Sequence, residues 1–131
     1  MTVGQASRPA PPVKRLVEAG IRVCAGVDGI RDAWAPYGNT DLLERAMLIG
    51  LRNNFRDDPD IELAFGLCST GGASVLRIED YGLDVGCRAD GVLVEAETVA
   101  EAVVSRPVRK LVLKNGKVVA REGEALIEAA G

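Results

Sequence analysis

The sequence has 131 residues, a length that fits one ordinary domain. Hydrophobic residues make up 47% and charged residues 27%, and 16 Lys and Arg against 19 Asp and Glu leave a formal net charge of −3. These proportions exclude wholesale disorder, collagen and coiled coil. Nucleic-acid binding is not expected either, because a phosphate backbone is bound mainly through Lys and Arg, and the sequence has no basic block.

The sequence contains no histidine. This excludes an imidazole general base, a histidine-containing catalytic triad and any His-ligated metal site built from this chain alone. A complete enzyme of any of these kinds would therefore need residues from elsewhere.

Cysteine usage and the opening residues indicate a compartment. Cys24, Cys68 and Cys87 are odd in number, widely spaced and set among apolar or small residues, which predicts reduced, buried thiols. The first dozen residues are polar and Pro-rich, without the apolar core of a signal peptide. No apolar run approaches the ~18 residues needed to cross a bilayer. We therefore expect a cytoplasmic protein without membrane contact.

The first part of the sequence predicts a helix followed at once by a buried strand. A helix opens at the Pro11-Pro12 pair and ends at Gly20. The apolar run over residues 21–27 has the length of a strand, and strands of covered parallel sheets are apolar on both faces. This order is typical of an α/β protein. Asp28 ends the predicted strand, and a loop over residues 29–39 follows it.

Two longer helices are predicted next. Asn39 or Thr40 caps a helix that continues to about Phe55, and a second helix begins at Pro59 and ends near Cys68. The Ser-Thr-Gly-Gly run that follows predicts a break, with one or two further helical turns after it.

The pattern changes after Tyr81, where we predict a boundary between subdomains. Apolar runs at residues 89–95, 108–114 and 117–121 predict three strands. Asn115-Gly116 joins the last two. This dipeptide is the strongest short signal for a type I′ hairpin, because both central residues of that turn need a positive φ.

Asp28 is the strongest candidate for a functional residue. A carboxylate at the C-terminal end of a buried strand, followed by a glycine and a loop, lies where α/β folds place their chemistry. The loop after it carries the only tryptophan, Trp34, together with Tyr37, Arg31 and Asp32. An aromatic wall beside a carboxylate suits a flat heterocycle. Two structural interpretations stay open, with Asp28 as a turn residue and Trp34 as a cover over the core.

Two stretches of the sequence carry motifs. Residues 32–38 have the pattern Asp-x-Trp-x-Pro-Tyr-Gly, and residues 81–90 end in Gly-x-x-Ala-Asp, with the hairpin of residues 108–119 behind them. Together they resemble the C-terminal third of the cytosine deaminase-like metal-dependent amidohydrolases. The first stretch, taken over residues 12–44, is similar to the family's last barrel helix, eighth strand, metal-site aspartate and following loop. The second is similar to strands of the small β-sandwich beside the barrel.

The resemblance implies an α/β fold class, as the C-terminal fragment of a (β/α)8 TIM barrel with strands of the accompanying β-sandwich. Residues 1–11 would be a flexible lead. Residues 12–80 would hold the last barrel helix, strand eight and the C-terminal helices, and residues 81–131 the sandwich strands and a tail. A lone strand eight would leave an apolar edge, so the implied partner is the missing barrel portion or a second copy of the chain.

The resemblance also implies an activity, which is the hydrolytic deamination of a cytosine-like aminoheterocycle. The complete enzyme would use a divalent metal, Zn or Fe. Asp28 would be the catalytic carboxylate and a metal ligand, and Trp34, Asp32 and Arg31 would bind the substrate. Because the family's metal-binding histidines are absent, we expect the isolated chain to be inactive and to bind no metal. The alternative is a non-catalytic assembly or interaction domain, or a relic of such an enzyme.

Overall fold

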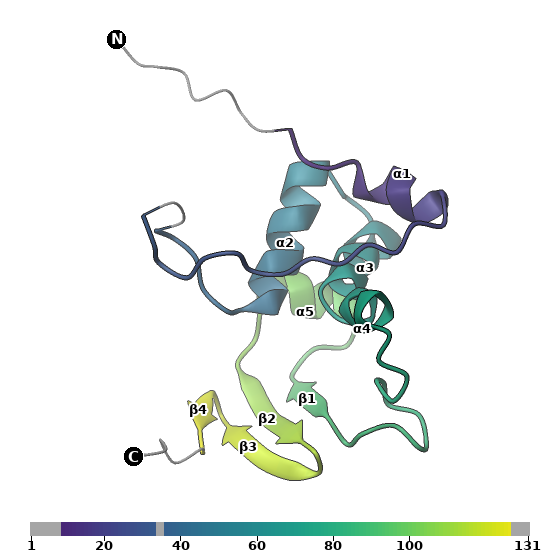
Figure 1. The fold of residues 1–131 in the computed structure, drawn as a ribbon. Coiled ribbons are helices and arrows are strands. Elements are labelled where there is room, and N and C mark those ends of the chain that lie inside the picture. Colours follow the sequence, from purple (N-terminus) through teal and green to yellow (C-terminus); the bar gives the residue numbers. More distant parts are fainter. Residues whose placement is uncertain (1–8, 34–35, 127–131) are drawn as a thin grey trace.

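The computed structural model describes residues 9–33 and 36–126. In this part of the chain, five helices lie together on one side of the molecule, and a small antiparallel sheet lies on the other side (Figure 1). None of the helices in these ranges has the length and apolar character of a membrane-spanning segment. The helices are α1 (Val13–Glu18), α2 (Leu42–Asn53), α3 (Asp58–Leu67), α4 (Thr70–Leu76) and α5 (Val99–Ser105), and the strands are β1 (Gly91–Val94), β2 (Arg109–Lys114), β3 (Lys117–Arg121) and β4 (Glu124–Ala125).

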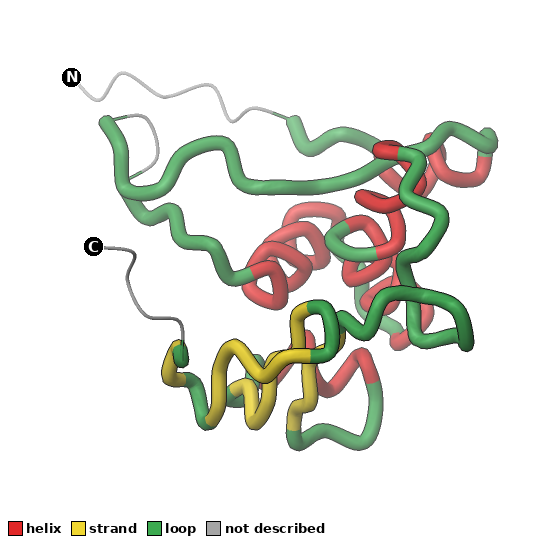
Figure 2. Tube along the Cα trace, turned by 60° about the horizontal axis from the view of Figure 1, so that its bottom comes forward, coloured by secondary structure: helices red, strands yellow, loops and turns green. Residues whose placement is uncertain are grey.

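The predicted buried strand over residues 21–27 is not a strand of any sheet, and this expectation was wrong. The segment is an extended loop that crosses α2 and α3 (Figure 1), and Figure 2 shows that the strands all lie together in the sheet. Its backbone bonds to helices rather than to a strand: the Ile21 N–H donates to Leu16 O at 3.0 Å and the Ala25 N–H to Leu67 O at 2.8 Å. Val23, Ala25 and Val27 are half-buried while the residues between them are exposed, as in a strand. A strand also needs a hydrogen-bonded neighbour, and the described part of the chain offers none.

The helix boundaries follow local signals, with one correction. Gly20 has a φ of +77° directly after α1, as its predicted place at the end of that helix requires. The cap of α2 is neither Asn39 nor Thr40 but Asp41, whose carboxylate accepts the N–H groups of Leu43 and Glu44. The Asp-x-x-Glu spacing from Asp41 is itself a capping signal that was overlooked.

The predicted break between helices is present, but it lies at Cys68 and Ser69, before the glycines. The further helical turns expected after it are α4, which begins at Thr70 and includes both glycines. A Cβ atom on Gly71 would lie 2.6 Å from Val23 O and 3.0 Å from Gly66 O. The glycine therefore serves the close approach of the 21–27 segment to α4. By contrast, α3 has Pro59 in its first turn as predicted, and Asp57 caps it.

The core is helical and is built mostly from small side chains. Ala46 of α2, Ala64 of α3 and Val103 of α5 are buried together with Cys68. Short side chains let the helix axes approach closely, which suits a sequence with few aromatic residues. This core packs α5 against α2 and α3, which lie on the other side of the predicted subdomain boundary after Tyr81. The boundary itself stays a prediction.

Sequence reasoning missed α5. Its N-cap is Thr98, whose hydroxyl accepts the Glu101 N–H at 3.0 Å, and the Glu101 carboxylate accepts the Glu97 N–H at 2.6 Å. This Thr-x-x-Glu spacing before an apolar run is a capping-box signal that could have identified the helix.

The sheet confirms the predicted strands. It has the order β1-β2-β3-β4, with every pair antiparallel. Asn115 has a φ of 50° and Gly116 a φ of 73°, as the predicted type I′ turn demands. The short strand β4 was not predicted.

Asp90, which directly precedes β1, contacts the turn of this hairpin. Its carboxylate accepts the Asn115 N–H at 2.7 Å and pairs with the Lys114 ammonium. The Asn115 N–H, followed by the Lys114 hydrogen bond, lowers the pKa of Asp90. A lowered pKa means that the ionised form stabilises the fold at pH values above the pKa of the unfolded chain, about 3.9, and that this contribution is lost as the pH falls through the folded-state pKa.

We therefore expect Asp90→Ala to lower the urea midpoint at pH 7, with the difference from wild type shrinking below a pH of about 4. Circular dichroism between pH 7 and 2.5 measures both midpoints. Asp84→Ala, which removes an exposed carboxylate from the preceding loop, is the control. A difference that stays constant over this pH range would contradict the linkage.

The three thiols differ in exposure. The prediction of buried thiols holds for Cys68, but Cys24 is exposed and Cys87 is partly exposed. Burial raises the pKa of Cys68, although the charge of Arg45 opposes this. We expect iodoacetamide at pH 8 to alkylate Cys24 first and Cys68 last, because the thiolate is the reactive form. Peptide mass spectrometry gives the order, which should vanish in urea; early labelling of Cys68 in the native chain would contradict its burial.

Candidate functional site

Asp28 lies where the extended 21–27 segment turns into the loop that leads to α2. Its side chain is exposed. The structure thus keeps the predicted order of apolar segment, carboxylate, glycine and loop, without the sheet that was expected around it. An exposed carboxylate at this position is accessible to an ion or a ligand.

The loop folds back on itself directly after Asp28. A Cβ atom on Gly29 would lie 2.0 Å from Asp32 Oδ2, so the Asp32 carboxylate lies against the glycine next to Asp28. Arg31 adopts the left-handed region with a φ of 55°, and its side chain is exposed. The structure therefore brings three of the predicted site residues, Asp28, Arg31 and Asp32, into one tight turn.

The aromatic part of the predicted site has a different status. Trp34 lies outside the described residues. Tyr37 is 94% exposed, so its ring packs against very little of the described structure. An aromatic wall beside Asp28 therefore stays a prediction.

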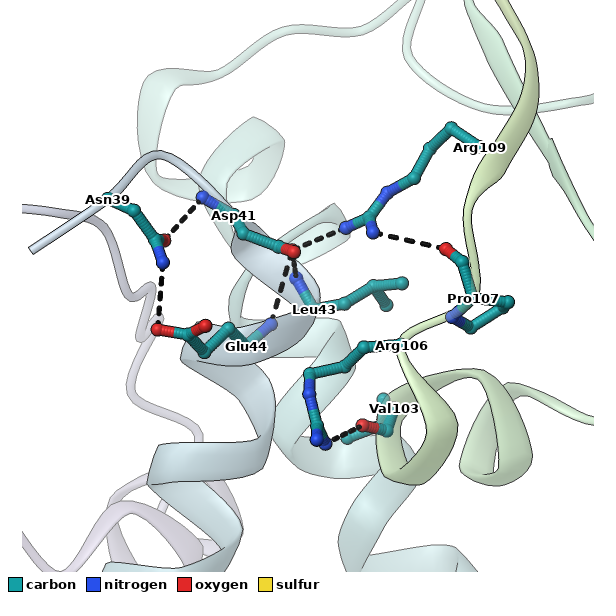
Figure 3. Close-up of polar contacts among 8 residues, drawn as sticks. All are labelled: Asn39, Asp41, Leu43, Glu44, Val103, Arg106, Pro107 and Arg109. Atoms are coloured by element: carbon teal, nitrogen blue, oxygen red, sulfur yellow. Dashed lines mark hydrogen bonds and ion pairs between the residues drawn. The ribbon is translucent and has the colours of Figure 1, made fainter. Parts of the chain in front are cut away.

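The far end of the loop is held by a polar network that sequence reasoning missed (Figure 3). The Asn39 amide oxygen accepts the Asp41 N–H at 2.8 Å, and its amide nitrogen donates to Glu44 Oε1 at 2.9 Å. Asp41 also pairs with Arg109 of β2. The role of Asp41 as a helix cap could be predicted from the local sequence. Its ion pair with an arginine 68 residues further on could not, because no local signal joins the two residues.

The described residues do not form a complete metal site. Within residues 9–33 and 36–126, no three Cys, Asp or Glu side chains lie close enough together to hold an ion, and the sequence has no histidine. Asp28 can nevertheless supply one ligand, since carboxylate oxygens bind divalent cations of several kinds.

An open apolar cavity of about 360 Å³ lies between the 21–27 segment and α2. Its lining includes Val23 and Ala25 from the segment, Ile49 from α2 and Leu67 from α3. The Arg45 Nε atom beside it is buried without a hydrogen-bond partner in the described structure. A buried donor without an acceptor is costly, so this face is incomplete in the described part of the chain.

Comparison with known proteins extends these observations. A model of the amidohydrolase family matches residues 3–120. N-isopropylammelide isopropyl amidohydrolase of Pseudomonas sp. (strain ADP) is 33% identical over 123 residues, which are 93% of this chain and 30% of that protein.

Two crystal structures are similar. N-isopropylammelide isopropylaminohydrolase from Burkholderia multivorans ATCC 17616 has 51% identity and a TM-score of 0.89, over 92% of this chain and 31% of that one. 5-Methylcytosine deaminase from Klebsiella pneumoniae, liganded with 5-fluorocytosine, has 28% identity and a TM-score of 0.78, over 90% and 29%. The chain thus spans about 30% of the length of the relatives it matches.

Proposed function

Because the chain belongs to the amidohydrolase family, we propose that it supplies the C-terminal part of a hydrolase that cleaves a C–N bond in an amino-substituted nitrogen heterocycle. The observation that carries the proposal is the turn after the 21–27 segment, which gathers Asp28, Arg31 and Asp32. Residues 12–80 would belong to the barrel and residues 81–131 to the β-sandwich beside it. The partner would be the rest of the barrel, which would also cover the apolar cavity along the 21–27 segment.

The substrate class is a flat ring that carries an amino or alkylamino group. The 51% identity to the Burkholderia multivorans enzyme favours an N-alkylamino ring such as N-isopropylammelide. The 28% identity to 5-methylcytosine deaminase supports a cytosine-type ring as the second candidate. Both rings are planar and present hydrogen-bond donors and acceptors at their edges, which Arg31 and Asp32 could bind as donor and acceptor respectively.

Proteins of this family generally use a divalent metal. When bound, such a metal lowers the pKa of a water molecule, which can then lose a proton and act as a nucleophile at neutral pH. Asp28 would contribute one ligand, and the remaining ligands would come from the rest of the barrel. One Asp28 carboxylate oxygen accepts the proton of the attacking water as the new C–O bond forms. The same oxygen then returns that proton to the departing nitrogen as the C–N bond breaks. The products are the ring carbonyl compound and an amine or ammonia.

The test uses a chimeric enzyme. This chain replaces the equivalent C-terminal segment of the Burkholderia multivorans aminohydrolase, which it matches over 31% of that protein. We expect the purified chimera, supplied with Zn²⁺ or Fe²⁺, to release isopropylamine from N-isopropylammelide or ammonia from cytosine. Chromatography of the products measures this.

The isolated chain under the same conditions is the matched control and should release nothing. A folded, metal-loaded chimera that hydrolyses neither substrate would contradict the proposed function. Turnover by the isolated chain would contradict the need for the rest of the barrel.

A further inference from the structure

The apolar cavity beside the 21–27 segment is lined by an arginine that lacks a hydrogen-bond acceptor. Arg45 belongs to α2 and is half-buried, and its Nε atom is fully buried without a partner in the described structure. Water cannot reach this atom, and no oxygen of the described residues accepts its hydrogen. A donor in this state costs free energy, because it has lost its hydration and gained nothing in return.

The acidic residues nearest to Arg45 along α2 are engaged elsewhere. Asp41 lies four residues before it, a spacing at which ion pairs form along a helix, but the Asp41 carboxylate caps α2 and pairs with Arg109. Glu44 Oε1 accepts the amide of Asn39. None of the ion pairs among the described residues includes Arg45. Its guanidinium charge is therefore uncompensated in this part of the chain.

Cys68 does not supply the missing charge. The positive charge of Arg45 acts on this thiol, but burial is the larger effect and raises the pKa of Cys68, so the thiol is neutral at pH 7. The structure thus holds a cation at the edge of an apolar cavity and next to an apolar core. Such a cation calls for an anion from outside the described residues.

The face around Arg45 defines the chemistry of its partner. The cavity of about 360 Å³ is open, and Val23, Ile49 and Leu67 contribute apolar lining. An apolar segment fits this lining, and a carboxylate fits the guanidinium, because the planar guanidinium can donate to both carboxylate oxygens. The chain spans about 30% of the length of the relatives it matches, so the larger part of such a protein lies outside it and can supply that segment.

We propose that a segment of the rest of the barrel occupies this cavity, with apolar side chains against its lining and one carboxylate that pairs with Arg45. Arg45 is then the anchor that holds this chain to the remainder of the enzyme. The inference rests on the proposed function, because it takes the partner named there and adds the contact that fixes it. Loss of one member of a buried ion pair is strongly destabilising, so the anchor has a measurable effect.

Cys24 reports whether the cavity is covered, since it lines the cavity and is exposed in the described structure. We expect iodoacetamide at pH 8 to alkylate Cys24 at least about tenfold more slowly in the chimeric enzyme than in the isolated chain, because the covering segment excludes the reagent. A rate in the isolated chain that falls as its concentration rises would show that a second copy covers the cavity. Equal rates in the two proteins would show that nothing does, and either result overturns the inference.

Arg45→Met tests the anchor, because methionine retains an apolar stem and removes the guanidinium. In the chimera we expect this variant to raise the rate of Cys24 alkylation about tenfold or more, as the covering segment opens more often. Loss of a positive charge would by itself slow the reaction by disfavouring the thiolate, so a faster reaction reports exposure. Arg56→Met removes an exposed guanidinium outside the cavity lining and should leave the rate unchanged.

The partner of Arg45 is identified by replacing each Asp and Glu in the Burkholderia multivorans portion of the chimera with Asn or Gln. One of these variants should reproduce the faster alkylation of Cys24. Combining it with Arg45→Met should add nothing further, since both remove the same contact. If none of them reproduces the effect, the acceptor is not a carboxylate and the inference is wrong.

In the isolated chain, Arg45→Met should not be destabilising. It removes a donor without an acceptor there, so the urea midpoint should stay unchanged or rise. A lowered midpoint would mean that the acceptor lies in this chain itself, with Glu128 as the one acidic residue outside the described ranges, and would overturn the inference.

The two proposals fail in different ways. An active chimera in which Arg45→Met leaves the alkylation rate of Cys24 unchanged overturns this inference alone. A folded, metal-loaded chimera that protects Cys24 and responds to Arg45→Met, but hydrolyses neither substrate, overturns the proposed function.

Discussion

Replacement of Asp28 by Asn is expected to reduce kcat of the chimeric enzyme by at least about 10²- to 10⁴-fold, the usual contribution of a general acid–base group. The amide has nearly the shape of the carboxylate but cannot accept the proton of the attacking water, and it is a weaker metal ligand. Because Asp28 is exposed in the described structure, the substitution should leave the fold intact. Product release under saturating substrate, with circular dichroism as a check on folding, measures both effects.

Asp84→Asn is the control for this experiment, since it removes an exposed loop carboxylate outside the candidate site. It should retain wild-type kcat. If Asp28→Asn also retained wild-type kcat, Asp28 would be only a turn residue, and the interpretation of this chain as a non-catalytic assembly domain would gain support.

Val103→Asp is expected to unfold the helical part of the chain. The Val103 side chain is 2% exposed and packs with Ala46, Ala64 and Cys68. The side chains of this cluster are apolar, and burial of a charge among them is among the most destabilising of substitutions. A loss above about 4 kcal/mol is expected, which is most of the stability of an ordinary small domain.

Val104→Asp is the matched control, because it makes the same change at the next position of α5, where the side chain is 58% exposed. Differences in helix propensity cancel between the two variants. Urea unfolding, followed by circular dichroism, should place Val104→Asp within about 0.5 kcal/mol of wild type. If both variants lost the same stability, this would contradict the burial of Val103 between α5, α2 and α3.

The sequence alone determined the features that arise from neighbouring residues. The Asn115-Gly116 turn formed as predicted because its positive φ angles are a property of those two residues. The starts of α1 and α3 followed from proline for the same reason, since its ring fixes φ. Asp28, Arg31 and Asp32 could be selected as site candidates because they are close in the sequence, and α5 could have been found from Thr98 and Glu101.

Only the tertiary structure decided what depends on distant partners. The 21–27 segment has the composition and alternating burial of a strand, yet whether it becomes one depends on a neighbour that lies elsewhere. Gly71 belongs to the run that predicts a break between helices, but in the structure it lies inside α4 and permits the close approach of Val23 O across the chain. The pair between Asp41 and Arg109 joins residues whose local sequences carry no trace of each other, because an ion pair leaves its signal only in the folded geometry.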